Sequence, residues 1–258
     1  MRGLLFLLLI PLVVVIQTAL PQSALGQTVN HQWIGGAGSW FDAANWSTGE
    51  VPTGGKYYPI NVADIGFFGG QAGQVTGLDV MVDNVDVLAV GSGSSFAGSQ
   101  ETNVFQSIQN AGVVDFPRLN LPLEAPIDIQ NDGFITTQQL ESHGGIVIDG
   151  VGEWLVGTGD HLFLNGGTIV NGASHLISGS GTLRIPFDSF GSLDFVNFGT
   201  VFSDDQLLLR GAMNNRGTLR TESGGLLSTF LLTNHGTVQI DSSHVSASDV
   251  TNSVSGGH

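Results

Sequence analysis

Beyond its N-terminus the chain is a succession of short apolar segments separated by Gly, Asn, Asp and Ser. The apolar segments are rich in Val, Ile, Leu, Phe and Thr, which favour β-strands, and the residues between them favour turns. The chain contains 38 glycines, and charged residues make up only 11% of it, so the Glu, Lys and Arg that favour helices are scarce. We therefore expect an all-β fold.

A tetrapeptide of the form Asn-x-Gly-Thr recurs in this pattern. Its full copies begin at Asn165, Asn197, Asn215 and Asn234, and looser copies begin at Asn110, Asn131 and Gly179. Aligned on the second glycine (positions 112, 133, 167, 181, 199, 217 and 236), the copies are spaced by 21, 34, 14, 18, 18 and 19 residues. The gap of 34 has room for two repeats. A short repeat with a nearly fixed period is typical of a solenoid, in which each repeat forms one turn, or rung.

Two aligned positions are apolar in every copy. Two residues after the glycine stand Val114, Ile135, Ile169, Leu183, Val201, Leu219 and Val238, and four residues before it stand Ile108, Ile129, Phe163, Ile177, Phe195, Met213 and Leu232. Because alternate side chains of a strand point to opposite faces, these positions are expected to face a shared interior. Stacking of successive rungs would bury them in continuous columns.

The positions between these columns have a different character. The residues Thr168, Thr182, Thr200, Thr218 and Thr237 directly follow the glycine, and their β-branched side chains suit an outward ladder. We expect the glycine to supply a positive φ at a corner, and the asparagine to bond either its own backbone or the next asparagine along the stack.

These observations predict a parallel β-helix. The handedness rule for parallel connections favours a right-handed coil, although a rung of about eighteen residues also suits a left-handed one. We expect the regular repeats over residues 106–258 and irregular first rungs, preceded by a cap, over residues 27–105. A β-sandwich is the alternative, but a sandwich has no reason to repeat one corner tetrapeptide at a near-constant interval.

Before the repeats lies a tryptophan-rich segment, which runs from Trp33-Ile-Gly-Gly-Ala-Gly-Ser-Trp40 through Asn45-Trp46 to Pro52. It resembles the opening of secreted bacterial β-helix proteins that carry autotransporter-associated repeats or PEP-CTERM sorting signals. The resemblance covers about twenty residues. It implies a cap in which Trp33, Trp40 and Trp46 close the end of the coil against water. The alternative for these three residues is a carbohydrate-binding platform, since exposed tryptophans stack on sugar rings.

The N-terminus has the layout of a secretory signal peptide, with Arg2, an apolar run from Leu4 to Ile16 and small residues around Ala24 and Gly26. We expect residues 1–26 to be removed and the mature chain to be secreted or held at the outer cell surface, an uncleaved anchor being the alternative. No stable membrane span is expected after removal, because the apolar run is too short.

The remaining chain would carry six basic residues (seven less Arg2) against 22 acidic ones, so nucleic acid is excluded as a partner. Extracellular polysaccharide and other surface proteins are the expected partners. The chain has no cysteine, which leaves neither disulfides nor thiol chemistry.

One column of acidic residues is a candidate metal site. Five residues after the repeat glycine, Asp204, Glu222 and Asp241 fall in one column, and stacking would place their carboxylates about 4.8 Å apart. Calcium, which takes six to eight oxygen ligands, could relieve their repulsion; solvated turn residues are the simpler reading. The seven histidines lack the spacing of a zinc site, and we expect them in surface turns.

No catalytic residue and no organic cofactor can be assigned from these patterns. The expected function is that of a non-enzymatic structural or adhesive module. A β-helix polysaccharide lyase or glycoside hydrolase is one alternative, and a calcium-stiffened surface fibre subunit is another.

Overall fold

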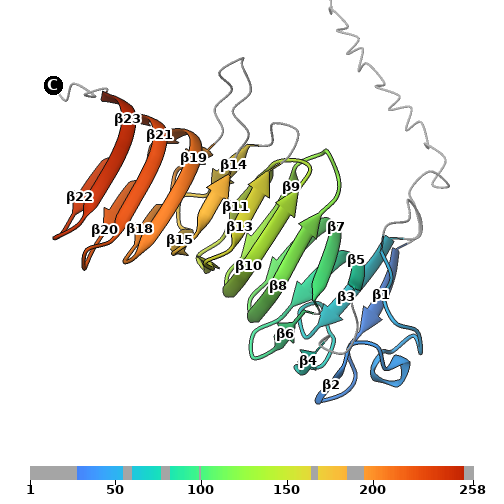
Figure 1. Ribbon diagram of the computed structural model, residues 1–258. Helices are drawn as coiled ribbons and strands as arrows, with labels where there is room; N and C mark the ends of the chain where they lie inside the picture. Colours follow the sequence, from blue (N-terminus) through green and yellow to red (C-terminus); the bar gives the residue numbers. More distant parts are fainter. Residues whose placement is uncertain are drawn as a thin grey trace, which may run out of the picture.

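The computed structural model describes residues 28–54, 60–76, 82–98, 100–163, 168–184 and 195–252. Within these ranges the chain winds into an elongated coil, with its N-terminal rungs at one end and its C-terminal rungs at the other (Figure 1). The expected signal peptide, residues 1–26, lies outside the described residues. The expectation of an all-β parallel solenoid is confirmed, whereas the hand of the coil stays a prediction.

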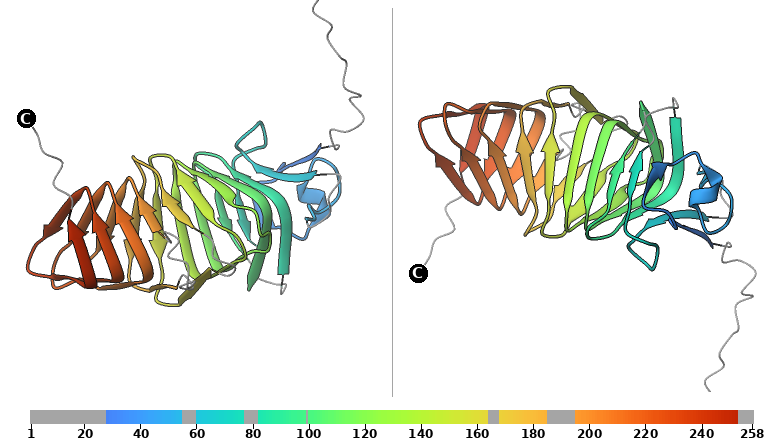
Figure 2. Two further views of the ribbon diagram at one scale, coloured as in Figure 1. Left: turned by 90° about the horizontal axis from the view of Figure 1, so that it is seen from above. Right: turned by 90° about the horizontal axis from the view of Figure 1, so that it is seen from below.

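The strands form one 23-stranded sheet, and its strand pairs are parallel. Most strands pair with the strand one rung before and the strand one rung after, so the sheet winds around the interior in three series (Figure 2). Each series forms one face of the coil.

The first face consists of β1 (Thr28–Gln32), β3 (Ile60–Ile65), β9 (Ile127–Asn131), β11 (Ile146–Asp149), β14 (Ile169–Asn171), β17 (Phe195–Asn197) and the second halves of β5 (Val82–Val90), β7 (Glu101–Asn110), β19 (Gln206–Asn215), β21 (Leu226–Asn234) and β23 (His244–Asn252). The second face consists of β2 (Ala37–Ser39), β4 (Gln74–Thr76), β6 (Ser95–Ala97), β12 (Glu153–Val156), β15 (Leu176–Gly179), β18 (Thr200–Ser203), β20 (Thr218–Thr221), β22 (Thr237–Ile240) and the first halves of β8 (Val113–Leu121) and β10 (Phe134–Ser142). The third face is built from β13 (Asp160–Phe163), β16 (Thr182–Arg184) and the remaining halves of the long strands.

The interior is filled by side chains stacked in register along each face. On the second face the inward column runs Val75, Phe96, Val114, Ile135, Trp154, Ile177, Val201, Leu219 and Val238. All but Val238, which is partly buried, are at most 4% exposed. Burying a side chain of this kind contributes about 1.5–3 kcal/mol, and each rung shares this gain with its two neighbours.

The predicted alignment of the repeats is confirmed for the copies at both ends of the coil. It is wrong for the two central copies, which are aligned on positions 167 and 181. Ile169 and Leu183 face inward as expected, but they belong to the first and third faces, where Ile169 pairs with Phe195 and Leu183 with Leu209. The second-face positions in these two rungs are Trp154 and Ile177 instead. Ile177 therefore does not belong to the column of Phe195 and Met213.

The threonine ladder is correspondingly shorter than expected. Thr200, Thr218 and Thr237 pair in register on the second face. Thr182 lies on the third face, where it pairs with Leu208, and Thr168 precedes β14 on the first face. The outward ladder therefore holds only in the last three repeats.

The corner glycines serve a purpose different from the one the sequence suggested. None of those at positions 112, 133, 199, 217 and 236 has a positive φ. A Cβ atom at Gly133 would instead lie 2.1 Å from the carbonyl oxygen of Gly112, and one at Gly217 would lie 2.1 Å from that of Gly199. Glycine is required at these corners because successive rungs approach too closely for any side chain.

An aromatic cluster caps the N-terminal end of the coil. The indole rings of Trp33 and Trp46 meet edge to face with centroids 5.1 Å apart, and Trp40 packs in the same way on Trp46 at 4.9 Å. The cluster continues into the interior through Phe96, 5.3 Å from Trp40. The single 3-10 turn among the described residues, Ala43–Asn45, connects Trp40 to Trp46.

Candidate functional site: an outer corner groove and a buried side-chain ladder

A ladder of hydrogen-bonded side chains runs along the interior at the end of the first face. Its members are Asn110, Asn131, His175, Asn171, Asn197, Asn215, Asn234 and Asn252. The side-chain amide nitrogen of Asn197 lies 2.8 Å from Asn215 Oδ1, and that of Asn215 lies 2.7 Å from Asn234 Oδ1. Each amide donates in the same direction along the coil, an arrangement in which hydrogen bonds polarise one another. The predicted bonding between successive asparagines is thus present.

His175 occupies a gap in this ladder. After β11 the chain continues with Gly150, so that rung supplies no asparagine between Asn131 and Asn171. The imidazole of His175 fills the position, with Nε2 3.0 Å from Asn131 Nδ2 and Nδ1 2.9 Å from Asn171 Oδ1. His175 is 1% exposed.

The neighbours of His175 fix its protonation state. Asn131 Oδ1 already accepts hydrogen bonds from Asn110 and from the Gly133 backbone, so the amide nitrogen of Asn131 faces the imidazole. Nε2 must therefore accept a hydrogen bond and Nδ1 must carry the proton. Burial lowers the pKa of His175 from 6.5 to about 4, and the Asp149 carboxylate opposes this shift only in part.

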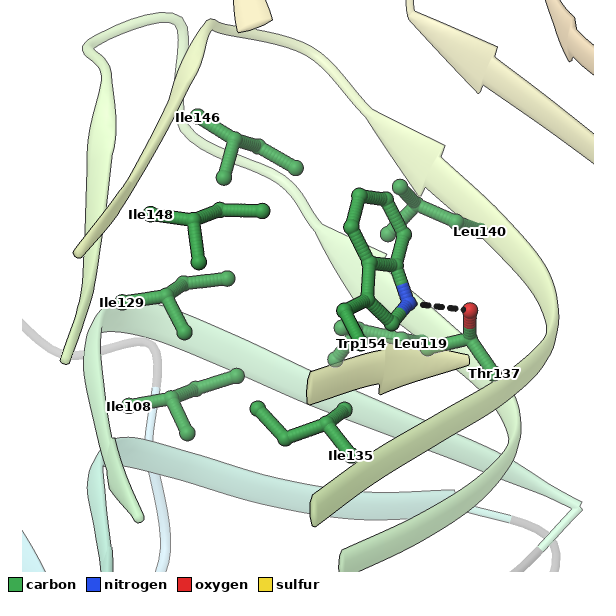
Figure 3. A pocket seen from close by; sticks show the side chains of 9 residues that line it. All are labelled: Ile108, Leu119, Ile129, Ile135, Thr137, Leu140, Ile146, Ile148 and Trp154. Carbon is green, nitrogen blue, oxygen red and sulfur yellow. Dashed lines mark hydrogen bonds between the residues drawn. The ribbon is translucent and has the colours of Figure 1, made fainter. Parts of the chain in front are cut away.

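A second histidine belongs to a separate network in the same part of the coil. Thr137 Oγ1 lies 2.8 Å from Trp154 Nε1 and 2.9 Å from His161 Nε2, and His161 takes an inward position between Leu140 and Leu183 on the third face. Beside this network lies a small cavity lined mostly by isoleucine and leucine (Figure 3). Its volume of about 10 Å³ would accommodate at most one water molecule, so it is a packing defect and not a ligand site.

Three histidines are therefore buried, contrary to the expectation of surface turns. Besides His161 and His175, His31 is 3% exposed and bonds Thr48 and Asn61 through its two ring nitrogens. Each of the three has polar partners for both ring nitrogens. The sequence offered no signal for this, because nothing local to a histidine shows which residues stack above and below it.

An open groove of about 450 Å³ lies on the outside of the coil, at the corner between the first and second faces. Its lining consists of Gly112, Asp132, Gly133, Phe134, Val151, Gly152, Glu153 and Leu176. The three glycines stack one above another at the corner, as their backbone hydrogen bonds to the following rungs show. The backbone of these glycines forms the floor between the side chains on either side.

The side chains along the groove are of two kinds. Phe134, Glu153 and Leu176 occupy successive outward positions of β10, β12 and β15, and Val151 is 72% exposed. Asp132 Oδ1 accepts a hydrogen bond from the Val151 backbone at 3.2 Å, which holds that carboxylate beside the groove. Glu153 hydrogen-bonds Ser178. The charged residues lining the groove, Asp132 and Glu153, are thus both acidic.

The predicted acidic column is present in the backbone but does not form a metal-binding cluster. Asp204, Glu222 and Asp241 each follow directly on β18, β20 and β22, which pair in register. Glu222 forms an ion pair with Arg220, and Asp204 and Asp241 are exposed to solvent. Among the described residues no group of three His, Cys, Asp or Glu side chains is arranged to hold a metal ion.

The three tryptophans of the cap are 0 to 1% exposed. Two of the indole nitrogens donate to backbone carbonyls within the cap, from Trp33 to Gly36 at 3.1 Å and from Trp46 to Trp40 at 2.8 Å. Sugar stacking requires an accessible ring face, whereas these rings are covered by protein. This geometry favours the cap over the carbohydrate platform.

Comparison with known proteins adds no assignment. No protein-family model matches the chain, and no curated protein or solved structure matches it either. Within the described residues, no helix has the length and apolar character needed to cross a membrane.

Proposed function

We propose that this chain is a secreted or cell-surface structural and adhesive module, without enzymatic activity, that contacts extracellular polysaccharide or other surface proteins. The observation that carries the proposal is the coil itself. Its strands pair in register from β1 to β23, and this pairing presents outward side chains at intervals of about 4.8 Å along the faces. Repeated side chains at a regular interval suit a repetitive ligand such as a glycan chain.

The composition and the N-terminus support the cellular location in this proposal. The net charge of −15 keeps such a protein soluble, and the layout of residues 1–26 is that of a secretory signal. Expression of the full chain and of a chain lacking residues 1–26 in a bacterial host, followed by fractionation, tests the location. Export of the full chain alone is the expected result, and retention of both in the cytoplasm would overturn it.

Co-sedimentation of the mature chain with a panel of insoluble polysaccharides tests the adhesive role. We expect saturable binding to at least one of them with no release of sugar. Absence of binding to every polysaccharide and to intact cells would overturn the proposal.

One observation favours an enzymatic alternative. Asp132 and Glu153 contribute two carboxylates to a single groove, and glycoside hydrolysis uses a pair of carboxylates. The same co-sedimentation samples are therefore assayed for new reducing ends and for unsaturated sugars. Release of either product that is lost in Glu153→Gln would identify a hydrolase or lyase and contradict the non-enzymatic proposal.

A further inference from the structure

The groove at the corner of the first and second faces is shallow and wide open to solvent, with a volume of about 450 Å³. Its glycine floor follows from the fold, because a Cβ atom at Gly152 would lie 2.2 Å from the carbonyl oxygen of Gly133. Gly152 therefore has no room for a side chain, and the floor of the groove is backbone.

The chemistry of the lining limits what can bind there. Phe134, Val151 and Leu176 offer apolar contact of the kind that the C–H faces of a pyranose ring make. Asp132 and Glu153 offer carboxylate oxygens, which accept hydrogen bonds from hydroxyl groups and form ion pairs with ammonium groups. A ligand that is both flat and cationic would use both sets of groups.

The charge of the protein further limits the kind of glycan that can bind in the groove. The mature chain carries 22 acidic residues against six basic ones, which disfavours a polysaccharide bearing uronate or sulfate groups. Arg118, the basic residue nearest in sequence, lies on the third face, where it pairs with Glu101 and Glu141. Among the residues that the structure describes, no basic side chain lines the groove to receive an anion.

We infer that this groove binds a glycan carrying free amino groups, such as a chain of 2-amino-2-deoxy sugars, whose ammonium groups pair with Asp132 and Glu153 while its rings lie on Phe134, Val151 and Leu176. This inference deepens the proposed function and rests on it. The acidic pair supplies selectivity for the cationic sugar, and the apolar residues distinguish a sugar chain from a simple polyamine.

Calorimetric titration of the mature chain at pH 6 and low salt tests this inference. The ligands are a fully deacetylated glucosamine hexasaccharide, its N-acetylated counterpart and spermine. We expect the deacetylated hexasaccharide to bind at least tenfold more tightly than the other two. The double variant Asp132→Asn, Glu153→Gln should weaken its binding tenfold or more.

Because a strongly acidic protein attracts any polycation, the matched control removes two exposed acids far from the groove. The variant Asp205→Asn, Asp249→Asn has the same net charge as the groove variant and should bind within about twofold of the parent. Equal losses in both double variants would show diffuse charge attraction and overturn the site. A further variant, Val151→Arg, places a cation at an exposed position of the groove and should abolish binding without disturbing the interior.

The outcomes separate this inference from the proposed function. Equal affinity for the acetylated and deacetylated chains would refute recognition of the amine while leaving polysaccharide adhesion intact. Binding that survives Val151→Arg would place the ligand on another face and refute the groove. A melting curve of each variant at pH 6 shows that the coil is retained, so that a loss of binding reports on the groove itself.

Discussion

The imidazole of His175 lies 3.0 Å from the side-chain amide of Asn131, although 44 residues separate them in the chain. This contact joins the asparagines of the N-terminal rungs to those of the C-terminal rungs. It also requires a neutral imidazole, because the amide nitrogen of Asn131 donates to Nε2. The ladder is therefore intact only while His175 carries no charge.

The first prediction concerns the pH dependence of stability. Unfolded histidine binds a proton near pH 6.5, whereas folded His175 does so only near pH 4. Between these values the unfolded state holds more protons, so the free energy of unfolding falls as the pH falls. The contribution of His175 is fully present above pH 6.5 and lost by about pH 4, a change of about 3 kcal/mol. Urea denaturation at pH 7.5, 5.5 and 4.5 measures it.

Replacing single histidines tests whether His175 causes this pH dependence of the free energy of unfolding. The variant His175→Asn should be less stable at pH 7.5 and should lose most of the dependence between pH 6.5 and 4. The exposed His244 serves as the control, and His244→Asn should keep the dependence of the parent. An unchanged slope in His175→Asn would contradict the role given to the buried imidazole.

The second prediction concerns the asparagines. Asn197 is fully buried, and its side chain bonds those of Asn171 and Asn215 and the Thr218 carbonyl. Asn197→Ala leaves these partners unsatisfied in the interior, and we expect a loss of about 2–4 kcal/mol. Asn252→Ala, at the exposed end of the ladder, should cost under about 0.5 kcal/mol. Chemical denaturation compares the two, and equal effects would argue against the ladder.

The third prediction concerns the inward columns of the second face. Val201 is fully buried, while its neighbour Thr200 points outward. Val201→Asp buries a carboxylate among apolar side chains and should prevent folding or cost more than about 4 kcal/mol. Thr200→Asp should change the free energy of unfolding by less than about 1 kcal/mol. Thermal melting of the two variants gives the comparison, and similar melting temperatures would refute the register.

The fourth prediction concerns the corner glycines. A Cβ atom at Gly217 would lie 2.1 Å from the Gly199 carbonyl oxygen, so Gly217→Ala must push two rungs apart. We expect it to cost about 3 kcal/mol, in the upper range for single substitutions. Gly36→Ala is the matched control, since a Cβ atom there has no neighbour within 4 Å. Its melting temperature should stay within about 2 °C of the parent; a similar fall in both variants would remove the steric explanation.

The sequence predicted the solenoid because its last repeats are nearly regular. The copies at Gly199, Gly217 and Gly236 stand 18 and 19 residues apart, and these corners do stack. Side-chain alternation within a strand then suffices to identify the buried positions, as for Val201 and Leu219.

The centre of the coil could not be read in the same way. A tetrapeptide of turn residues fits any corner of the coil. The sequence therefore places Gly179-Ser-Gly-Thr182 at the corner between the first and second faces, whereas it lies between the second and third faces. In that rung His175 occupies the corner between the first and second faces. Its backbone carbonyl accepts a hydrogen bond from the Thr200 backbone nitrogen, just as the Gly199 carbonyl accepts one from the Thr218 nitrogen. A histidine in place of a glycine gives no signal in an alignment built on glycine.

The groove was equally hidden from the sequence. Its residues come from four successive rungs, which the register between rungs brings together at one corner. The tetrapeptide repeats identify two of the three floor glycines, Gly112 and Gly133, as corner residues. Gly152 does not belong to a copy of the tetrapeptide. Neither Asp132 nor Glu153 belongs to a recognisable motif, so their proximity follows only from the register of β10 and β12.

The coil requires parallel register between successive rungs, and cysteine cross-linking measures this register directly. The chain has no native cysteine, so pairs can be introduced at will. Thr200 pairs with Thr218, and two residues later Phe202 pairs with Arg220. In the parallel coil, we expect a short thiol-reactive cross-linker to join Thr200→Cys with Thr218→Cys efficiently, and likewise Phe202→Cys with Arg220→Cys. Antiparallel strands could join one of these pairs but not both, and that result would contradict the coil.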